Sequence, residues 1–477
     1  MRNSLSRHFV GLALCALPLT AGANQLLDLY RLAQEQDQTF QAALHQREAS
    51  IEARPQAWAA LLPQLSGQGS IERNRLHVLS SSGSQLGSPG ATPVNAIEWY
   101  TNRAYSLNLS QTLFDWSAFQ AVAQANQEVA QAEALFRSAE QSLITRTASA
   151  YFAVLSALDT LRADLDAQAS FKQQLDQAQK KFEVGLAAIT DVRNAQASYD
   201  SSVATVIADR TALDNARRVL ATVVGQPVDV IADLQAEIPL VAPNPASVDD
   251  WSKAAAQDNP DLMSARYAAE AARKAIAVNQ GKYLPTLSAG GTLNRANSHS
   301  RFGDDTLSDA VGLTLNWNLF QGGLVASAVR QAKASYRQAQ AQYELQRRTV
   351  DQNTRNDYEG VVSGIAAVRA SRQAVISNQT SLEATEVGLK VGTRTEIDVL
   401  VARQALATAQ KTYYQSRYNY LNSVLALKQD AGRLGAADLG DIDHLLTAEP
   451  HPLPTGVPEA EPPAAPSNPA IDPSSKP

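Results

Sequence analysis

Apolar residues recur every seven positions along several long stretches of the chain. The first such series is Val122, Val129, Phe136 and Leu143, followed after a step of eleven by Val154 and Leu161. A sustained spacing of seven predicts helices packed as coiled coils, and an eleven-residue step is a stutter that locally unwinds the supercoil. The pattern predicts one long helix over about 117–182 and a shorter one over about 189–225.

The same pattern occurs twice in the chain, as an internal repeat. Shifted by 207 positions, the series returns as Val329, Tyr336, Tyr343, Val350, Val361 and Val368. LLPQLSGQGSIER from Leu61 matches YLPTLSAGGTLNR from Tyr283, and AYSLNLSQTLF from Ala104 matches AVGLTLNWNLF from Ala310. Each half is therefore predicted to run helix, strand, loop, strand, very long helix, turn and helix, with the first helix over about 25–60.

This duplication divides the chain into five expected parts. They are a signal peptide (1–23), a first structural repeat (24–228), a proline-rich connector (229–248), a second structural repeat (249–432), and a C-terminal segment with a disordered tail (433–477).

The predicted strands alternate between apolar and polar residues. Leu313, Leu315 and Trp317 alternate with Thr314 and Asn316, and the first pair of strands has the same pattern. A membrane barrel with lipid outside and water inside has this pattern, and so does a half-buried soluble sheet. Trp99 and Tyr100 either lie at a membrane interface or end a strand.

Four strands cannot close a barrel, and an open sheet edge cannot face lipid. A membrane barrel would therefore need two, three or four copies of the chain.

The N-terminus favours export. Arg2 and Arg7 precede an apolar run from Phe9 to Leu19, and a small-residue site ends at Ala23, as in a signal peptide. The single cysteine, Cys15, falls inside this segment, so the exported chain is expected to have no thiol. Lipid attachment at Cys15 is the alternative, and the bulky Leu14 disfavours it.

Charge and motifs exclude several function classes. With 18% charged residues and a net charge of −6, the chain lacks the basic surface that nucleic acid requires. It has no phosphate-binding loop, no G-x-S-x-G and no histidines at metal spacing, so we expect neither an enzyme nor a cofactor. A structural coiled-coil envelope protein without channel activity is the alternative that these absences leave open.

A short motif follows each long helical stretch. VGLAAITDV contains Gly185, and VGTRTEIDV contains Gly392. Glycine readily adopts the positive φ that a helix end needs, so both are expected to end a helix where the chain reverses. Acceptors and acids then suit the start of the next helix; these are Thr190, Asp191, Glu396 and Asp398.

Together, the repeated order, the LPxLS segments and the two VG turns resemble the TolC family of outer-membrane channel proteins over about 24–432. The resemblance implies a mainly α fold with membrane β: a trimeric, 12-stranded β-barrel continuous with a long α-helical coiled-coil barrel in the periplasm. It also implies that the connector (229–248) and the C-terminal segment (433–477) form an equatorial segment around this barrel. It also implies a homotrimer in the outer membrane that docks with a periplasmic adaptor (membrane fusion) protein and an inner-membrane RND or ABC pump. The cargo would be proteins (type I secretion), drugs or other toxic small molecules.

The resemblance also assigns site residues. Thr190, Asp191 and Arg394 would belong to a network that closes the periplasmic tip, and Asp398 to a carboxylate ring that could hold a cation. Leu389 replaces an expected aromatic hydroxyl and Val401 an expected second acid, which implies a weaker latch and a single ring. The tip residues expected to contact the adaptor are Gly185, Leu186, Gly392 and Thr393. Asp191 and Asp398 have an alternative interpretation as simple helix caps.

Overall fold

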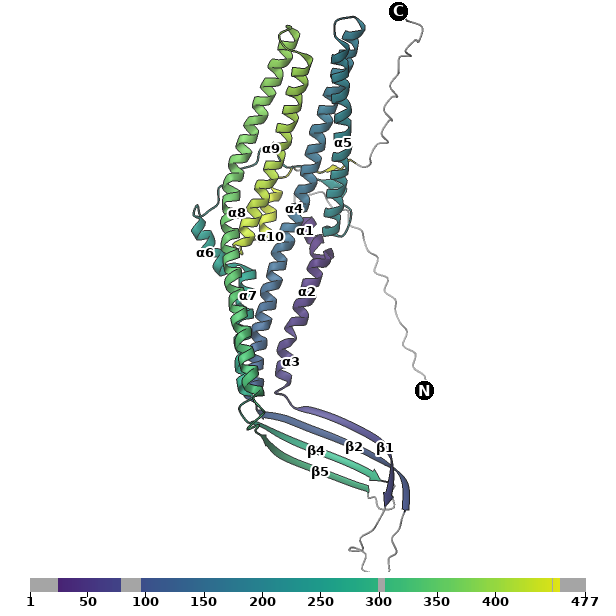
Figure 1. Cartoon of the computed structure of the whole chain (residues 1–477), viewed down its shortest axis with the longest axis vertical. Coiled ribbons are helices and arrows are strands. Elements are labelled where there is room, and N and C mark those ends of the chain that lie inside the picture. The colour runs from purple at the N-terminus through teal and green to yellow at the C-terminus, as the bar shows by residue number, and fades with distance from the viewer. Residues whose placement is uncertain (1–24, 79–95, 299–304, 448, 455–477) are drawn as a thin grey trace, which may run out of the picture.

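The computed structural model describes residues 25–78, 96–298, 305–447 and 449–454. It is elongated, with a rod of helices that leads at one end into a four-stranded sheet (Figure 1). The expected signal peptide, Cys15, the chain after residue 454 and the two loops between paired strands (79–95 and 299–304) lie outside the described residues.

Two very long helices run along the rod. α4 spans Trp116–Glu183 and α8 spans Leu324–Lys390, and each is followed by an antiparallel partner, α5 (Ile189–Val224) or α9 (Glu396–Asp430). Many positions of the seven-residue series are buried, including Val122, Leu143, Val154, Leu161, Val206, Leu213, Val361, Val368, Val399 and Tyr420. The predicted long helices are confirmed to within a residue or two. Across the described ranges, no helix combines the length and apolar character needed to cross a membrane.

The single helix expected over about 25–60 is wrong as a continuous element. The structure divides it into α1 (Gln25–Gln36), α2 (Gln38–Ile51) and α3 (Ala53–Ala59). At Asp37 the backbone is extended, and the carboxylate accepts the Phe40 amide at 2.6 Å as an N-cap. This capping bond favours a new helix start over continuation of α1.

The second half repeats this break at the equivalent position. Asn259 separates α6 (Val248–Asp258) from α7 (Pro260–Gly281), and its side-chain oxygen accepts the Leu262 amide at 2.9 Å. Asp37 and Asn259 are related by the same shift of 222 positions that relates the LPxLS segments. The duplication therefore extends to individual capping residues.

The sheet is antiparallel throughout, in the order β1-β2-β4-β5. Its strands are β1 (Gln64–Val78), β2 (Ala96–Phe114), β4 (Thr286–Ser298) and β5 (Asp305–Asn316). The register gathers apolar side chains on one face, where they are exposed in the single chain: Leu65, Ile71, Tyr105, Leu107, Leu109, Leu293, Val311, Leu313 and Leu315. The other face carries Ser66, Ser106, Asn108, Thr292 and Thr314, so the predicted alternation is confirmed.

Trp99 and Tyr100 lie on opposite faces of β2, because neighbouring strand residues alternate. Trp99 shares the apolar face and is 58% exposed.

The connector and the C-terminal segment lie together beside the rod. β3 (Val230–Ile231) pairs with β6 (His451–Pro452), and α10 (Ala436–Asp443) packs against α1. The Asp443 carboxylate accepts the Leu26 amide at 2.8 Å at the start of α1. Segments from the beginning, middle and end of the chain thus meet near the middle of the rod (Figure 1).

Candidate functional site at the ends of the helical hairpins

Each long helix ends in the same kind of glycine turn. Gly185 and Gly392 have φ values of 75° and 77°. The amide of the following residue donates to a carbonyl five positions earlier, at 2.7 Å from Leu186 to Lys181 and at 2.9 Å for Thr393 in the second turn. These bonds form Schellman motifs, which satisfy the last carbonyls of a helix. The prediction that the two glycines end the long helices is confirmed.

The acids at the start of the next helices act as caps within the chain. Asp191 accepts the Ala188 amide at 3.3 Å, and Asp398 accepts the amide of Thr395 at 2.8 Å and its hydroxyl at 2.9 Å. The Thr395 amide, then its hydroxyl and the charge of Arg394 lower the pKa of Asp398 below its ordinary value. This capping opposes the proton uptake that a ring of neighbouring carboxylates would cause.

The four expected gate residues lie at one end of the rod. Thr190 and Asp191 are in the first turn of α5, while Arg394 and Asp398 lie at the start of α9 (Figure 1). Among the described residues, no hydrogen bond or ion pair joins Thr190 or Asp191 to Arg394. Leu186 is 79% exposed, so the tip is accessible. Within one chain these residues therefore lie at the same end of the rod, but the expected network of hydrogen bonds and ion pairs does not form among the described residues.

The contact that does join the hairpins near their tips involves Glu396. Its carboxylate accepts hydrogen bonds from Lys181 Nζ at 2.6 Å and from the Gln174 amide, both on α4. The Glu396 side chain is only 12% exposed. Sequence reasoning gave Glu396 only a place at the start of a helix. One feature of the sequence could have indicated its role: the equivalent residue of the first repeat, 207 positions earlier, is the apolar Ile189.

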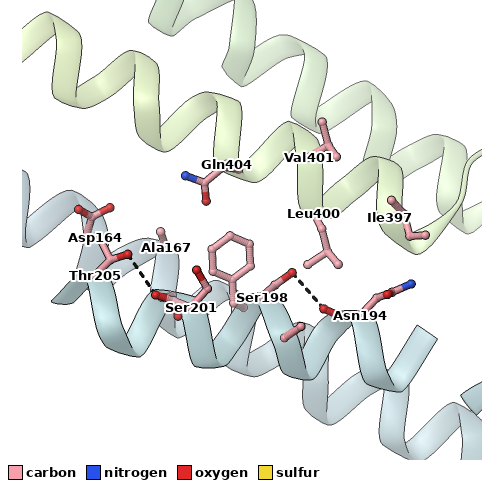
Figure 2. Close-up of a pocket in the computed structure, with 13 residues that line it drawn as sticks. Asp164, Ala167, Asn194, Ser198, Ser201, Thr205, Ile397, Leu400, Val401 and Gln404 are labelled. Atoms are coloured by element: carbon pink, nitrogen blue, oxygen red, sulfur yellow. Dashed lines mark hydrogen bonds between the residues drawn. The ribbon is translucent and has the colours of Figure 1, made fainter. Parts of the chain in front are cut away.

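A cleft of about 590 Å³ separates the hairpins below this contact. Figure 2 shows Ser198, Ser201 and Thr205 of α5 on one side. Leu400 and Val401 of α9 lie on the other. The hairpins are therefore not packed tightly together along this part of their length.

A second ionic contact lies at the lower end of the cleft. Lys411 of α9 donates to both carboxylate oxygens of Asp164 on α4, each at 3.0 Å. Burial, then hydrogen bonding to Asp164 and repulsion by its charge, raise the pKa of Asp209 on α5 to about 7. Ion pairs thus connect the two hairpins at both ends of the cleft.

The other half has a neutral version of the acid pair. Ser371 and Ser416 stand 207 positions after Asp164 and Asp209, and their hydroxyl oxygens are 2.9 Å apart. The coiled coil therefore needs no acids at this level.

Comparisons with known proteins agree with this architecture. The family model described as outer membrane efflux protein matches residues 29–226 and 251–433, which are most of the two repeats. The chain is 32% identical over 450 residues to outer membrane protein TolC of Escherichia coli (strain K12), covering 92% of this chain and 88% of the relative. It is also 32% identical over 441 residues to the alkaline protease secretion protein AprF of Pseudomonas aeruginosa, covering 90% of this chain and 89% of that one.

Solved structures show the same fold. The outer membrane channel CmeC of Campylobacter jejuni superposes with a TM-score of 0.72 at 17% identity, over 94% of this chain and 98% of that one. The outer membrane protein VceC of Vibrio cholerae superposes with a TM-score of 0.71 at 21% identity, over 86% and 96%. Given the match of the family model to both repeats and the identity to curated relatives over most of its length, the chain belongs to the TolC family of outer membrane efflux proteins.

Proposed function

We propose that three copies of the chain form an exit duct in the outer membrane that continues into the periplasm. The observation that carries this proposal is the open sheet, whose apolar face is exposed and whose edge strands β1 and β5 each have only one neighbouring strand in the part of the chain that the structure describes. A sheet of this kind can enter lipid only when other copies close it into a barrel. Three copies of four strands give the 12 strands that the family resemblance implies.

The helical rod would form the periplasmic part of the duct. Each chain supplies two hairpins, one from the repeat at 24–228 and one from the repeat at 249–432, and the connector and C-terminal segments would form a belt around them. This arrangement explains why one chain contains two versions of the same hairpin.

The gate would lie at the hairpin tips. Thr190 and Asp191 lie at the level of Arg394, and no hydrogen bond or ion pair joins them to it among the described residues, which suits contacts between neighbouring copies. Asp398 would form a ring of three carboxylates, which favours cations at the narrowest point. Its Thr395 cap keeps each carboxylate charged and so strengthens that preference.

The tip would also dock with a periplasmic adaptor protein, which links the duct to an inner-membrane RND or ABC pump. The exposed turn residues Gly185, Leu186, Gly392 and Thr393 would make this contact. TolC and AprF are named for the outer membrane and for alkaline protease secretion. The cargo of this chain is accordingly proposed to be secreted proteins, toxic small molecules or both.

Planar bilayers test the duct directly. Purified mature protein should insert as a trimer and produce discrete, cation-selective conductance steps. A monomer that never inserts, or a trimer that binds bilayers without conducting, would contradict the proposal and favour the structural envelope protein.

A further inference from the structure

Arginine side chains lie just beyond the apolar band of the sheet. Following each strand away from the helices, the next positions on the apolar face are Arg73 on β1, Arg103 on β2 and Arg295 on β4. All three are exposed, and Arg75 follows Arg73 on the same face. On three of the four strands, arginines therefore follow the apolar band that lies next to the rod, and exposed Trp99 and Leu307 lie at or beyond their level on the same face.

The register places these arginines in a continuous line. Arg103 pairs with Ile71, two residues before Arg73, and Arg295 pairs with Tyr105, two residues from Arg103. Going from β1 to β2 to β4, each arginine therefore lies two residues closer to the helical rod than the one before it. Strands in a barrel are tilted by roughly 35–45°, so a level belt around a barrel requires a stagger of this kind.

The arginines are available for a ligand. Arg73 and Arg75 lie over the Trp99 ring, at 5.6 and 5.7 Å from its centroid. Within the described residues, Arg73, Arg75 and Arg103 have no carboxylate partner, whereas Arg295 lies 3.3 Å from Asp305. Guanidinium groups bind phosphate oxygens in bidentate fashion, and tryptophan is typical of membrane interfaces.

We propose that Arg73, Arg103 and Arg295 bind the phosphate groups of the phosphorylated glycolipid, lipopolysaccharide, that forms the outer leaflet of a Gram-negative outer membrane. Two features support this occupant. The belt directly continues the apolar face, so its ligand must sit where acyl chains meet a headgroup. It also lies at the sheet end away from the rod, which is the outer leaflet when the rod is periplasmic. The inference rests on the membrane insertion proposed above.

On β5 the corresponding position carries an acid. Asp309 follows Val311 on the apolar face, and Asp305 lies farther along. Because β5 and β1 are the two edges, β5 of one copy would adjoin β1 of the next. Pairing of Arg73 with Asp309 of a neighbouring copy is therefore the competing use of this arginine.

The test measures lipid affinity of the full-length mature trimer in a neutral maltoside detergent. The probes are bisphosphorylated lipid A, its dephosphorylated form and phosphatidylglycerol, with bound lipid counted by native mass spectrometry. There are two triple variants. The Gln variant combines Arg73→Gln, Arg103→Gln and Arg295→Gln, and the Lys variant changes the same three residues to Lys. A matched control removes three exposed arginines of α8, by Arg330→Gln, Arg337→Gln and Arg369→Gln.

We expect the Gln variant to bind bisphosphorylated lipid A about a hundredfold more weakly, because each basic residue at an anionic lipid surface contributes roughly fivefold. The Lys variant should fall between, since it keeps charge but loses bidentate geometry. The control should match the wild type, and dephosphorylated lipid should bind all of them weakly.

Three results would overturn the proposal. They are unchanged lipid A affinity in the Gln variant, equal affinity of the wild type for phosphatidylglycerol, and loss of the trimer in the Gln variant while the control assembles. Loss of the trimer would mean that the arginines form ion pairs between copies instead of binding lipid. Conductance of the same preparations in phosphatidylcholine bilayers separates this outcome from failure of the duct itself, because wild-type protein that conducts without binding lipid A refutes only the belt.

Discussion

Lys181 on α4 and Glu396 on α9 form an ion pair with an Nζ–Oε1 distance of 2.6 Å, and this pair ties the two hairpins of one chain together near their tips. The Glu396 side chain is mostly buried, while Lys181 is 42% exposed. Partial exposure limits the strength of such a pair to about 1 kcal/mol.

Glu396→Gln is expected to loosen the tip by about that amount, because the neutral amide keeps the shape but loses the charge. Spin labels on introduced cysteines at Leu186 and Thr393 would show a broader distance distribution than in the wild type. Lys180→Gln removes a neighbouring charge that makes no such pair and serves as the control. An identical distribution for all three proteins would mean that the pair does not restrain the hairpins.

The proposed gate is tested by Asp191→Ala combined with Arg394→Ser. If these residues close the tip between copies, their loss should favour the open state by roughly fivefold for each hydrogen bond removed. Single-channel recordings in planar bilayers would then show larger or longer openings. Unchanged conductance would exclude both residues from the gate and leave Asp191 as a helix cap only.

The Asp164–Asp209 pair predicts a pH dependence. The pKa of Asp209 is raised to about 7 from an ordinary value of 3.8, so the folded chain binds this proton more tightly than the unfolded chain. This contribution to stability is complete below about pH 4 and is lost as the pH rises through 7. Because Asp209 is partly exposed to solvent, we expect a loss of about 1 kcal/mol rather than the full value of the shift.

The other half of the chain supplies the matched variant. Replacing the pair by Asp164→Ser with Asp209→Ser copies Ser371 and Ser416, and it should flatten the fall in melting temperature between pH 4 and 7. Asp209→Asn, which mimics the protonated acid, should do the same, because its amide can donate a hydrogen bond to Asp164 but does not titrate. Equal pH dependence in the wild type and both variants would show that the pair does not titrate in this range.

The capping residue Asp37 predicts a local effect on stability. Asp37→Ala removes the cap of α2 and leaves Arg146, 2.8 Å away in the structure, without its partner. We expect a cost of about 1–2 kcal/mol, seen as faster hydrogen exchange at the start of α2. Asp37→Asn should retain most of the protection, since Asn259 caps α7 in the same way. Equal exchange in the alanine variant and the wild type would contradict this role.

Docking predicts that cysteines at Leu186 and Thr393 form cross-links with an adaptor, whereas a cysteine at the exposed Leu345, far from the tip on α8, does not. Cross-linking at Leu345 alone would move the contact away from the turns.

The elements that depend on local pattern could be predicted from sequence. Spacings of seven predicted α4, α5, α8 and α9 because coiled-coil burial repeats at that interval, and Gly185 and Gly392 predicted the helix ends because few other residues adopt positive φ. The break at Asp37 was missed because the buried residues on either side of it, Ala33 and Phe40, keep the seven-residue spacing of a continuous helix. Glu396 was missed because its partners lie more than two hundred positions earlier. The network of Thr190, Asp191 and Arg394 was expected to close the tip. No hydrogen bond or ion pair joins Thr190 or Asp191 to Arg394 among the described residues of one chain, so its formation between copies stays a proposal.

The difference between Glu396 and Ile189 has a consequence for the assembled ring. Three chains would contribute six helical hairpins of two alternating kinds. The two kinds have similar shapes, but the second helix begins with Ile189 in one and with Glu396 in the other. A change at Glu396 would alter the first turn of every second hairpin, and the hairpins between would lose the partner of their Lys181 and Gln174. Duplication within the chain thus allows charge to repeat three times around an axis on which shape repeats six times.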